Sequence, residues 1–259
     1  MIPKTLILHA TGTNRDHDAA AAIGLAGGDA EIVHLNQLRR GEKKWSDYQM
    51  LVLSGGFSYA DALGAGKLLA LDMNTYFDEE IHSFITSGKP VIGICNGFQA
   101  LIKSGLLIQM DKKTEVKATL TFNASGHFEC RWVTLKPISK KCIWTQNLSE
   151  LIDCPVAHGE GNFMLDDITQ VNTLIESDQI AFTYVNDDGK HANGRYPANP
   201  NGSIMDIAGI CNRDGNVLGL MPHPENHIHH YQHPLRSRGM TSRIGLSIFI
   251  NGIKYSKQI

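Results

Sequence analysis

Short apolar runs alternate with helix-like stretches through the first part of the chain. The runs have four to six mostly apolar residues and predict buried strands at 5–8, 30–35, 50–53 and 91–94. Helices are expected at 16–25, ended by Gly27 and Gly28, and at 76–86, ended by Gly88. Because strands that alternate with helices form parallel sheets, the pattern predicts a parallel sheet wrapped by helices.

The second part of the chain has further strand runs but fewer helical ones. Strands are expected at 128–135, 156–158, 181–185 and 217–221, with the middle ones antiparallel. Asn, Pro and Gly at 193–203 predict the longest loop, and 241–254 should form a closing helix with Ile244, Ile248 and Phe249 facing inward. No repeat or linker divides the pattern, so we expect one α/β domain over residues 1–259, with an open, mostly parallel central sheet flanked by helices.

Composition narrows the class of protein. A chain of 259 residues with 42% hydrophobic residues can bury one large core. The net charge of −2 gives no reason to expect nucleic acid or an acidic membrane surface as a partner, and no stretch approaches the roughly 18 apolar residues of a membrane helix. Five cysteines without paired spacing, and no apolar leader, lead us to expect a reducing, cytoplasmic location.

The predicted strand at 91–94 ends at a thiol between two glycines. Cys95 follows Gly93-Ile94 and precedes Asn96-Gly97, where a helix-forming run begins. A tight strand-to-helix turn needs small neighbours and lifts its central side chain clear of the sheet, and the helix N-terminus favours a thiolate there. A buried structural cysteine is the alternative. The two glycines favour a nucleophile.

A candidate base lies far downstream, in Met221-Pro222-His223-Pro224-Glu225. Two prolines should hold this segment extended, so that His223 and Glu225 point the same way and the carboxylate orients the imidazole. The alternative is a histidine on a polar surface loop, which is how we interpret the four that follow, at 227, 229, 230 and 233. Without a paired-cysteine motif, their spacing does not predict a metal site.

Donors for a developing oxyanion are expected in the turn Ser54-Gly55-Gly56-Phe57, directly after the strand at 50–53. The alternative is an ordinary turn at the end of a strand. A phosphate-binding loop at 64–67 is disfavoured, because Leu68 stands where that motif needs Ser or Thr and Asp61 occupies its first glycine position.

Residues 93–99 and 223–225 resemble the class I, or triad, glutamine amidotransferases, which take ammonia from glutamine. The resemblance implies a flavodoxin-like fold and a catalytic triad of Cys95, His223 and Glu225. It also implies an oxyanion hole made of Gly55, Gly56, Phe57 and Asn96. The residues that would bind glutamine are Gln99, His158, Gly159 and Glu160. For Gln99, an exposed helix position is the alternative.

Further segments resemble the branch of this family that serves purine biosynthesis, at 12–14, 54–59, 128–133, 158–163 and 207–212. That branch implies a separate synthetase subunit, which uses the ammonia to convert formylglycinamide ribonucleotide to its amidine. Whether a small third subunit joins the two is left open by the sequence. The chain shows no phosphate loop, so no cofactor is expected in it, and ATP with Mg²⁺ would belong to the partner. Arg15, Ala60 and the His-rich tail at 226–234 depart from the family pattern.

Three other functions stay open at this point. The chain could supply ammonia to another synthetase, or act alone as a cysteine hydrolase on γ-glutamyl compounds. It could also be a non-catalytic scaffold of the same fold, although an intact Cys95, His223 and Glu225 argue against that.

Overall fold

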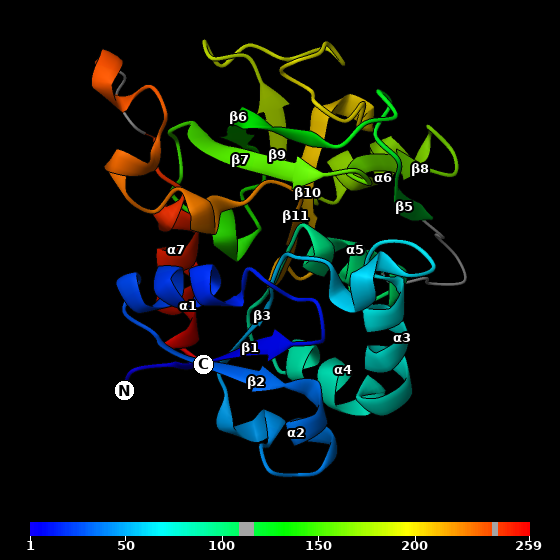
Figure 1. Ribbon diagram of the computed structural model, residues 1–259, viewed down its shortest axis with the longest axis vertical. Coiled ribbons are helices and arrows are strands. Elements are labelled where there is room, and N and C mark those ends of the chain that lie inside the picture. Colours follow the sequence, from blue (N-terminus) through cyan, green and yellow to red (C-terminus); the bar gives the residue numbers. More distant parts are fainter. Residues whose placement is uncertain (109–116, 240–242) are drawn as a thin grey trace.

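A computed structural model describes residues 1–108, 117–239 and 243–259. Nine strands form one mixed sheet in the order β2-β1-β3-β4-β11-β10-β9-β6-β7 (Figure 1). In chain order these strands are β1 (Lys4–His9), β2 (Asp29–His34), β3 (Met50–Leu53), β4 (Val91–Ile94), β6 (Glu129–Pro137), β7 (Ile152–His158), β9 (Ile180–Val185), β10 (Ile207–Cys211) and β11 (Val217–Leu220). Two short strands, β5 (Ala118–Thr121) and β8 (Asn162–Leu165), pair separately and antiparallel.

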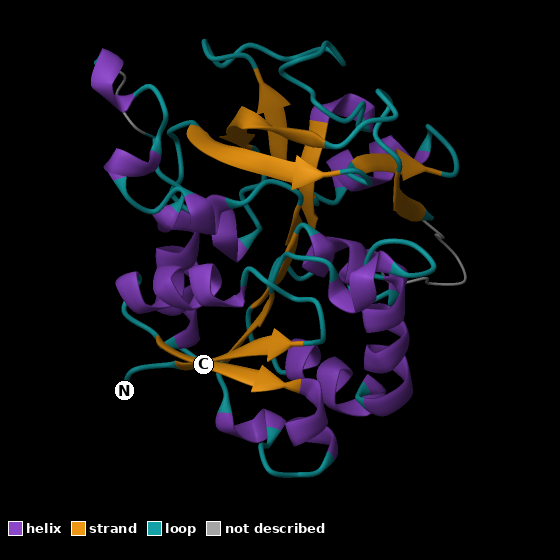
Figure 2. Ribbon diagram, in the orientation of Figure 1, coloured by secondary structure: helices purple, strands orange, loops and turns teal. Residues whose placement is uncertain are grey.

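The sheet has a parallel half, made of β2, β1, β3, β4 and β11. Its central strands are buried on both faces, which explains why they are continuous apolar runs. Helices α1 (Asp16–Leu25) and α7 (Leu246–Ser256) cover one face. Helices α3 (Lys67–Tyr76), α4 (Asp78–Thr86) and α5 (Asn96–Lys103) cover the other (Figure 2).

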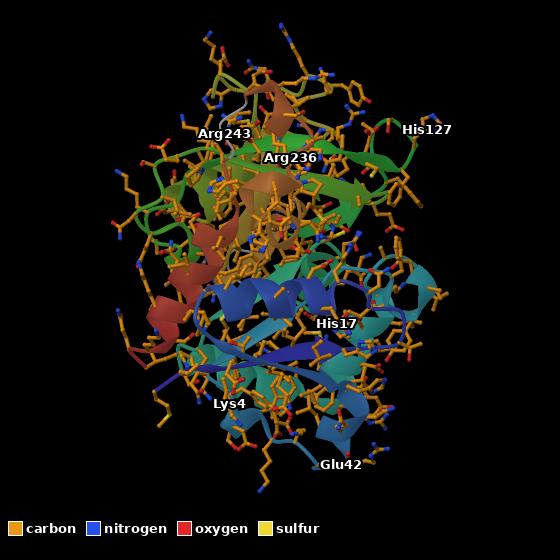
Figure 3. All side chains as sticks on the ribbon, turned by 60° about the vertical axis from the view of Figure 1, so that its left-hand side comes forward. Lys4, His17, Glu42, His127, Arg236 and Arg243 are labelled. Carbon is orange, nitrogen blue, oxygen red and sulfur yellow. The ribbon has the colours of Figure 1, made fainter. Side chains whose placement is uncertain are left out.

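The antiparallel half consists of β10, β9, β6 and β7, each paired antiparallel with its neighbour. Figure 3 shows His127 and Arg243 on this half, and Lys4 and Glu42 on the parallel half. The two remaining α-helices of the described ranges are α2 (Leu35–Arg39) and α6 (Gln170–Glu176). Within those ranges no helix is both long and apolar enough to cross a membrane.

The α/β class and the parallel order of the early strands are confirmed, whereas several element bounds are corrected. The expected helix at 76–86 is α4, which begins only at Asp78 with three acidic residues in its first turn. Tyr76 is the last residue of α3, and Phe77 leaves the helical region at φ −139°. The second strand ends at His34, since Leu35 already begins α2. Elements α2, α3, α6, β5, β8 and β10 were not expected.

The closing helix is shorter than expected. Its expected start at Thr241 lies outside the described residues, and the helix begins at Leu246, so Ile244 precedes it. Ile248 and Phe249 are fully buried on its inner face, as expected. Gly245 keeps the chain against the segment that follows β11, because a Cβ there would lie 2.6 Å from Cβ of Pro224.

Candidate active site

Cys95 forms the turn between β4 and α5 in a strained conformation, with φ 51° and ψ −104°. The glycines on either side are sterically required. A Cβ at Gly97 would lie 1.9 Å from the carbonyl oxygen of Leu53, and a Cβ at Gly93 would lie 2.7 Å from that of Gly97. The elbow therefore has the shape that the sequence predicts, with the thiol at the first turn of a helix.

Strand pairing brings the distant histidine to this turn. Strands β4 and β11 are parallel neighbours in which Ile94 pairs with Leu220, so both strands end at the same edge of the sheet. The N–H of Cys95 donates to the carbonyl of Leu220 at 2.8 Å. Three residues beyond the end of β11, the N–H of His223 donates to the carbonyl of Pro155 on β7 at 2.8 Å. The candidate base is thus held between both halves of the sheet.

His223 and Glu225 form a buried pair, with Nδ1 and Oε1 2.7 Å apart. The expected reason for this pairing is wrong: Pro224–Asn226 forms a 3-10 turn, and His223 has φ −104° and ψ 84°. A tight turn, rather than the alternation of an extended chain, brings the carboxylate to the ring. His223 Nε2 has no hydrogen-bond partner among the described residues and is the nitrogen left for chemistry.

The charges around His223 decide its protonation. Burial lowers its pKa, but the negative charges of Glu225 and Cys95 outweigh burial and raise the pKa to about 10. Cys95 itself is almost fully buried, with Sγ 3.8 Å from the carbonyl oxygen of Ala157 on β7. The geometry suits a cysteine nucleophile paired with a histidine that carries the proton.

The Gly-Gly turn borders both residues. A Cβ on Gly55 would lie 2.6 Å from Cε1 of His223 and 3.5 Å from Cβ of Cys95. The backbone N–H of Phe57, however, donates to the carbonyl of Gly12 at 3.1 Å. The expectation that Phe57 supplies an oxyanion donor is therefore not met in this conformation, because the turn pairs with the segment around Gly12.

Asn96 fixes the nucleophile turn to that loop. Its Oδ1 accepts from the hydroxyl of Ser58 at 2.5 Å and from its backbone N–H at 3.3 Å, while Nδ2 donates to Asp61 at 2.9 Å. The backbone N–H of Asn96 lies in the first turn of α5, where helical N–H groups have no acceptor within the helix. This N–H stays the predicted oxyanion donor, together with that of Gly56.

Gln99 and Glu160 connect α5 to the loop after β7. Gln99 is buried, which makes the exposed alternative wrong, and its Nε2 donates to the backbone carbonyl of Glu160 at 2.6 Å. The Glu160 carboxylate accepts from the N–H of Ala65 at 3.2 Å and lies 3.8 Å from Nζ of Lys103. Both predicted glutamine ligands therefore brace loops, and Gly159 lies against Phe128.

His158, the last residue of β7, is buried. Burial and the nearby charge of His223 lower its pKa to about 3, so the ring is neutral. Two amides that the sequence did not single out hold this region. Asn123 Nδ2 donates to the carbonyl of His158 at 2.8 Å, and Asn201 Nδ2 lies 3.2 Å from its Nε2. Asn201 falls in the Asn-rich loop at 193–203, and that composition was the one available signal.

The His-rich tail is partly structural. His227 and His233 are buried, with ring centroids 4.9 and 4.6 Å from that of Trp132, so the surface interpretation is wrong for these two. His230 is exposed. Across residues 1–108, 117–239 and 243–259, no group of three or more His, Cys, Asp or Glu side chains is arranged to hold a metal ion.

Comparisons with known proteins agree over nearly the whole chain. The family model of the CobB/CobQ-like glutamine amidotransferase domain matches residues 2–256. Phosphoribosylformylglycinamidine synthase subunit PurQ of Treponema denticola is 52% identical over 98% of this chain and 99% of its own, and that of Dehalococcoides mccartyi is 42% identical over 99% and 98%. A chain in the structure of PurLQS from Thermotoga maritima is 32% identical, with a TM-score of 0.74 over 98% of this chain and 99% of that chain. The chain belongs to the PurQ family of glutamine amidotransferases.

Proposed function

We propose that this chain is the glutamine-hydrolysing subunit of a phosphoribosylformylglycinamidine synthase, and that residues 1–259 act as one catalytic domain. The observation that carries the proposal is the strained Cys95 turn beside the buried His223–Glu225 pair, in a chain 52% identical to a PurQ subunit. A scaffold would have no use for a strained nucleophile turn, which costs roughly 1–3 kcal/mol to hold.

In the proposed mechanism the Cys95 thiolate attacks the side-chain amide carbon of glutamine. The backbone N–H groups of Asn96 and of the Gly-Gly turn stabilise the tetrahedral oxyanion, each worth about 2.7–4 kcal/mol of barrier. His223 gives its proton to the departing nitrogen, and ammonia leaves. His223 then takes a proton from water, which hydrolyses the γ-glutamyl thioester and releases glutamate, while Glu225 keeps the imidazole oriented throughout.

Glutamine would be held by the loop that follows β7. Because Gln99 and Glu160 already use their polar groups to connect loops, their contribution is to keep this loop in place. His158 and Gly159 are then the members of the predicted set that can face the substrate. The hydrogen bonds of Gln99 and Glu160 connect α5 to the loop after β7 and to the segment around Ala65. A movement of one of these segments should therefore displace the other.

The ammonia would be used by a second subunit. The Thermotoga maritima relative is a component of PurLQS, and the same assembly here would contain a synthetase subunit and a small third subunit. The synthetase would use ATP and Mg²⁺ to convert formylglycinamide ribonucleotide to its amidine, in the cytoplasm. Phe57 and Phe128 are exposed beside the Gly-Gly turn and Gly159, where a docking partner would meet them.

The test compares the nitrogen source. Purified chain and synthetase are supplied with formylglycinamide ribonucleotide, ATP and either glutamine or ammonium chloride. Cys95→Ala should abolish the amidation that depends on glutamine and leave the ammonium-dependent reaction intact, since the synthetase site is untouched. Loss of both reactions would mean that Cys95 is structural, and retention of both would remove it from the chemistry. Cys130→Ala, at an exposed cysteine, is the matched control and should change neither.

Coupling separates this function from a stand-alone γ-glutamyl hydrolase. The N–H of Phe57 is bound to Gly12 in the free chain, so the oxyanion turn is not fully available. We expect slow glutamate release from the isolated chain, and faster release when a substrate-loaded synthetase docks and rearranges the turn. Full activity that no synthetase changes would instead identify a stand-alone hydrolase.

A further inference from the structure

The loop between β9 and β10 buries amide side chains beside the active site. Asn199 and Asn201 are 2% and 0% exposed, although loops normally run over the surface. Buried amides are tolerated only when they are hydrogen-bonded. Asn199 Nδ2 donates to the carbonyl of Ser203 at 2.9 Å and to Asp206 at 2.9 Å. This loop is thus built around fixed amides, and Asn201 is the one that reaches a histidine of the site.

The orientation of the Asn201 amide follows from its partners. Its Oδ1 accepts from the backbone N–H of Ser203 at 3.1 Å, and a backbone N–H can only donate. An exchange of the two amide atoms would set two donors against each other, so Nδ2 must point to the other side. There it lies 3.1 Å from the hydroxyl of Tyr184 and 3.2 Å from Nε2 of His158.

The amide therefore decides where His158 carries its proton. Since Asn201 Nδ2 donates, Nε2 of His158 must accept and cannot hold a proton. The ring is neutral, because burial and the charge of His223 lower its pKa to about 3. Its single proton is then on Nδ1. That atom is buried and has no hydrogen-bond partner among the described residues.

We propose that Asn201 is a positioning residue that locks His158 as the neutral Nδ1–H tautomer, and that this N–H is the donor kept for an acceptor oxygen of bound glutamine. A buried donor without a partner is costly, so it is expected to be satisfied by a ligand. Gly161 leaves the space in which His158 and Asn201 meet. A Cβ at Gly161 would lie 2.1 Å from Nε2 of His158 and 2.9 Å from Nδ2 of Asn201.

The second half of this inference rests on the proposed glutaminase function, while the first half does not. The tautomer can be read without any substrate, from long-range ¹H–¹⁵N correlations of the full chain labelled at its histidine rings. In the wild type, His158 should show a protonated Nδ1 and an unprotonated Nε2. Its signals are assigned by their loss in His158→Gln. A protonated Nε2 in the wild type would overturn the proposal.

Asn201→Asp is the variant that reverses the lock at nearly constant size. A carboxylate accepts, so the His158 proton should move to Nε2, while the oxygen that binds the Ser203 N–H is retained. Because Nδ1 of His158 would then no longer carry a proton to donate, KM for glutamine should rise by about tenfold, the equivalent of one hydrogen bond to a buried group. The ammonium-dependent reaction of the complex should be unchanged. Asn186→Asp, at an exposed amide, makes the same chemical change away from the site and is the matched control.

The two measurements separate the possible failures. If the proton moves to Nε2 in Asn201→Asp but KM for glutamine stays at the wild-type value, His158 does not serve the substrate and the proposal fails in its second half. A thermal melt checks that the variant folds. If Asn201→Asp does not fold, Asn201→Ala provides the second variant, in which both tautomers of His158 should appear and KM should rise by about threefold. A single Nδ1–H tautomer in that variant would show that Asn201 is not the lock.

Discussion

The two halves of the sheet contribute differently to the site. In the parallel half, the neighbouring strands β4 and β11 end at the same edge of the sheet, and this places Cys95 and the segment that carries His223 in the site. The antiparallel half delivers backbone carbonyls and a neutral ring: Ala157 beside the thiol, Pro155 on the N–H of His223, and His158. The proposed reactive groups thus come from one half, and the groups that position and enclose them come from the other.

The difference follows from how each half is built. In a parallel sheet flanked by helices, the carboxyl ends of strands meet at one edge, so nucleophile and base can be brought together by strand order alone. Antiparallel strands send their ends to both edges, and loops must reach back to the site. The loop between β9 and β10 does so with the buried amides of Asn199 and Asn201. We expect substitutions in the parallel half to affect chemistry and those in the antiparallel half to affect binding or stability.

The largest effect should come from the base. His223→Ala should lower kcat for glutamine by about 10⁶-fold, as removal of a triad base does, whereas Glu225→Gln should lower it by about 10⁴-fold because an imidazole without its carboxylate is impaired but present. Glutamate release in the complex with the synthetase measures both. His230→Ala, at an exposed histidine, is the control. Wild-type activity in His223→Ala would contradict the triad.

The next test is steric and again concerns the parallel half. Gly55→Ala places a methyl group 2.6 Å from Cε1 of His223, so the ring or the turn must shift. A misplacement of about 1 Å in a catalytic group can cost about 10² in rate, and we expect kcat to fall by that order with little loss of stability. Gly24→Ala is the matched control, because nothing lies within 4 Å of a Cβ there. Equal activity of the two variants would place Gly55 outside the site.

In the antiparallel half a large stability effect should come with little change in chemistry. Arg243 makes two hydrogen bonds of 2.7 Å to the buried carboxylate of Asp153 on β7. Arg243→Met leaves that carboxylate without its cation, which costs about 3–5 kcal/mol, and urea unfolding should show it. Arg40→Met, which removes an exposed pair with Glu42, should cost no more than about 1 kcal/mol. A loss of kcat in the folded Arg243→Met protein would contradict the expectation that the antiparallel half affects stability rather than chemistry.

The dependence of stability on pH should be the most informative about charge. The pKa of His223 is raised in the folded protein to about 10, so its contribution to stability is full below pH 6.5 and is lost as pH rises toward 10. The pKa of His158 is lowered to about 3, so its contribution is present above pH 6.5 and is lost as pH falls toward 3. Glu225→Gln should flatten the alkaline side of the stability curve and His158→Gln the acid side. The opposite assignment would contradict the protonation described here.

Local sequence alone determined much of the parallel half and of its chemistry. The apolar runs identified β1, β3, β4 and β11, because a strand that is buried on both faces needs apolar residues at successive positions. The two glycines around Cys95 predicted the strained turn, since neighbouring backbone excludes a Cβ at either position. These features depend on residues close together in the chain, so their physical causes are visible in the sequence.

Only the tertiary structure decided what depends on segments far apart in the chain. The N–H of Phe57 donates a hydrogen bond to the carbonyl of Gly12, and the sequence of the turn could not reveal this. The tautomer of His158 depends on Asn201, 43 residues later in the chain, and on a loop whose composition predicts only irregular structure. The histidines of the tail divide into buried and exposed by their packing on Trp132 of β6. A hydrogen bond or a ring contact between distant segments has no local pattern, because it is set by which strands and loops fold against each other.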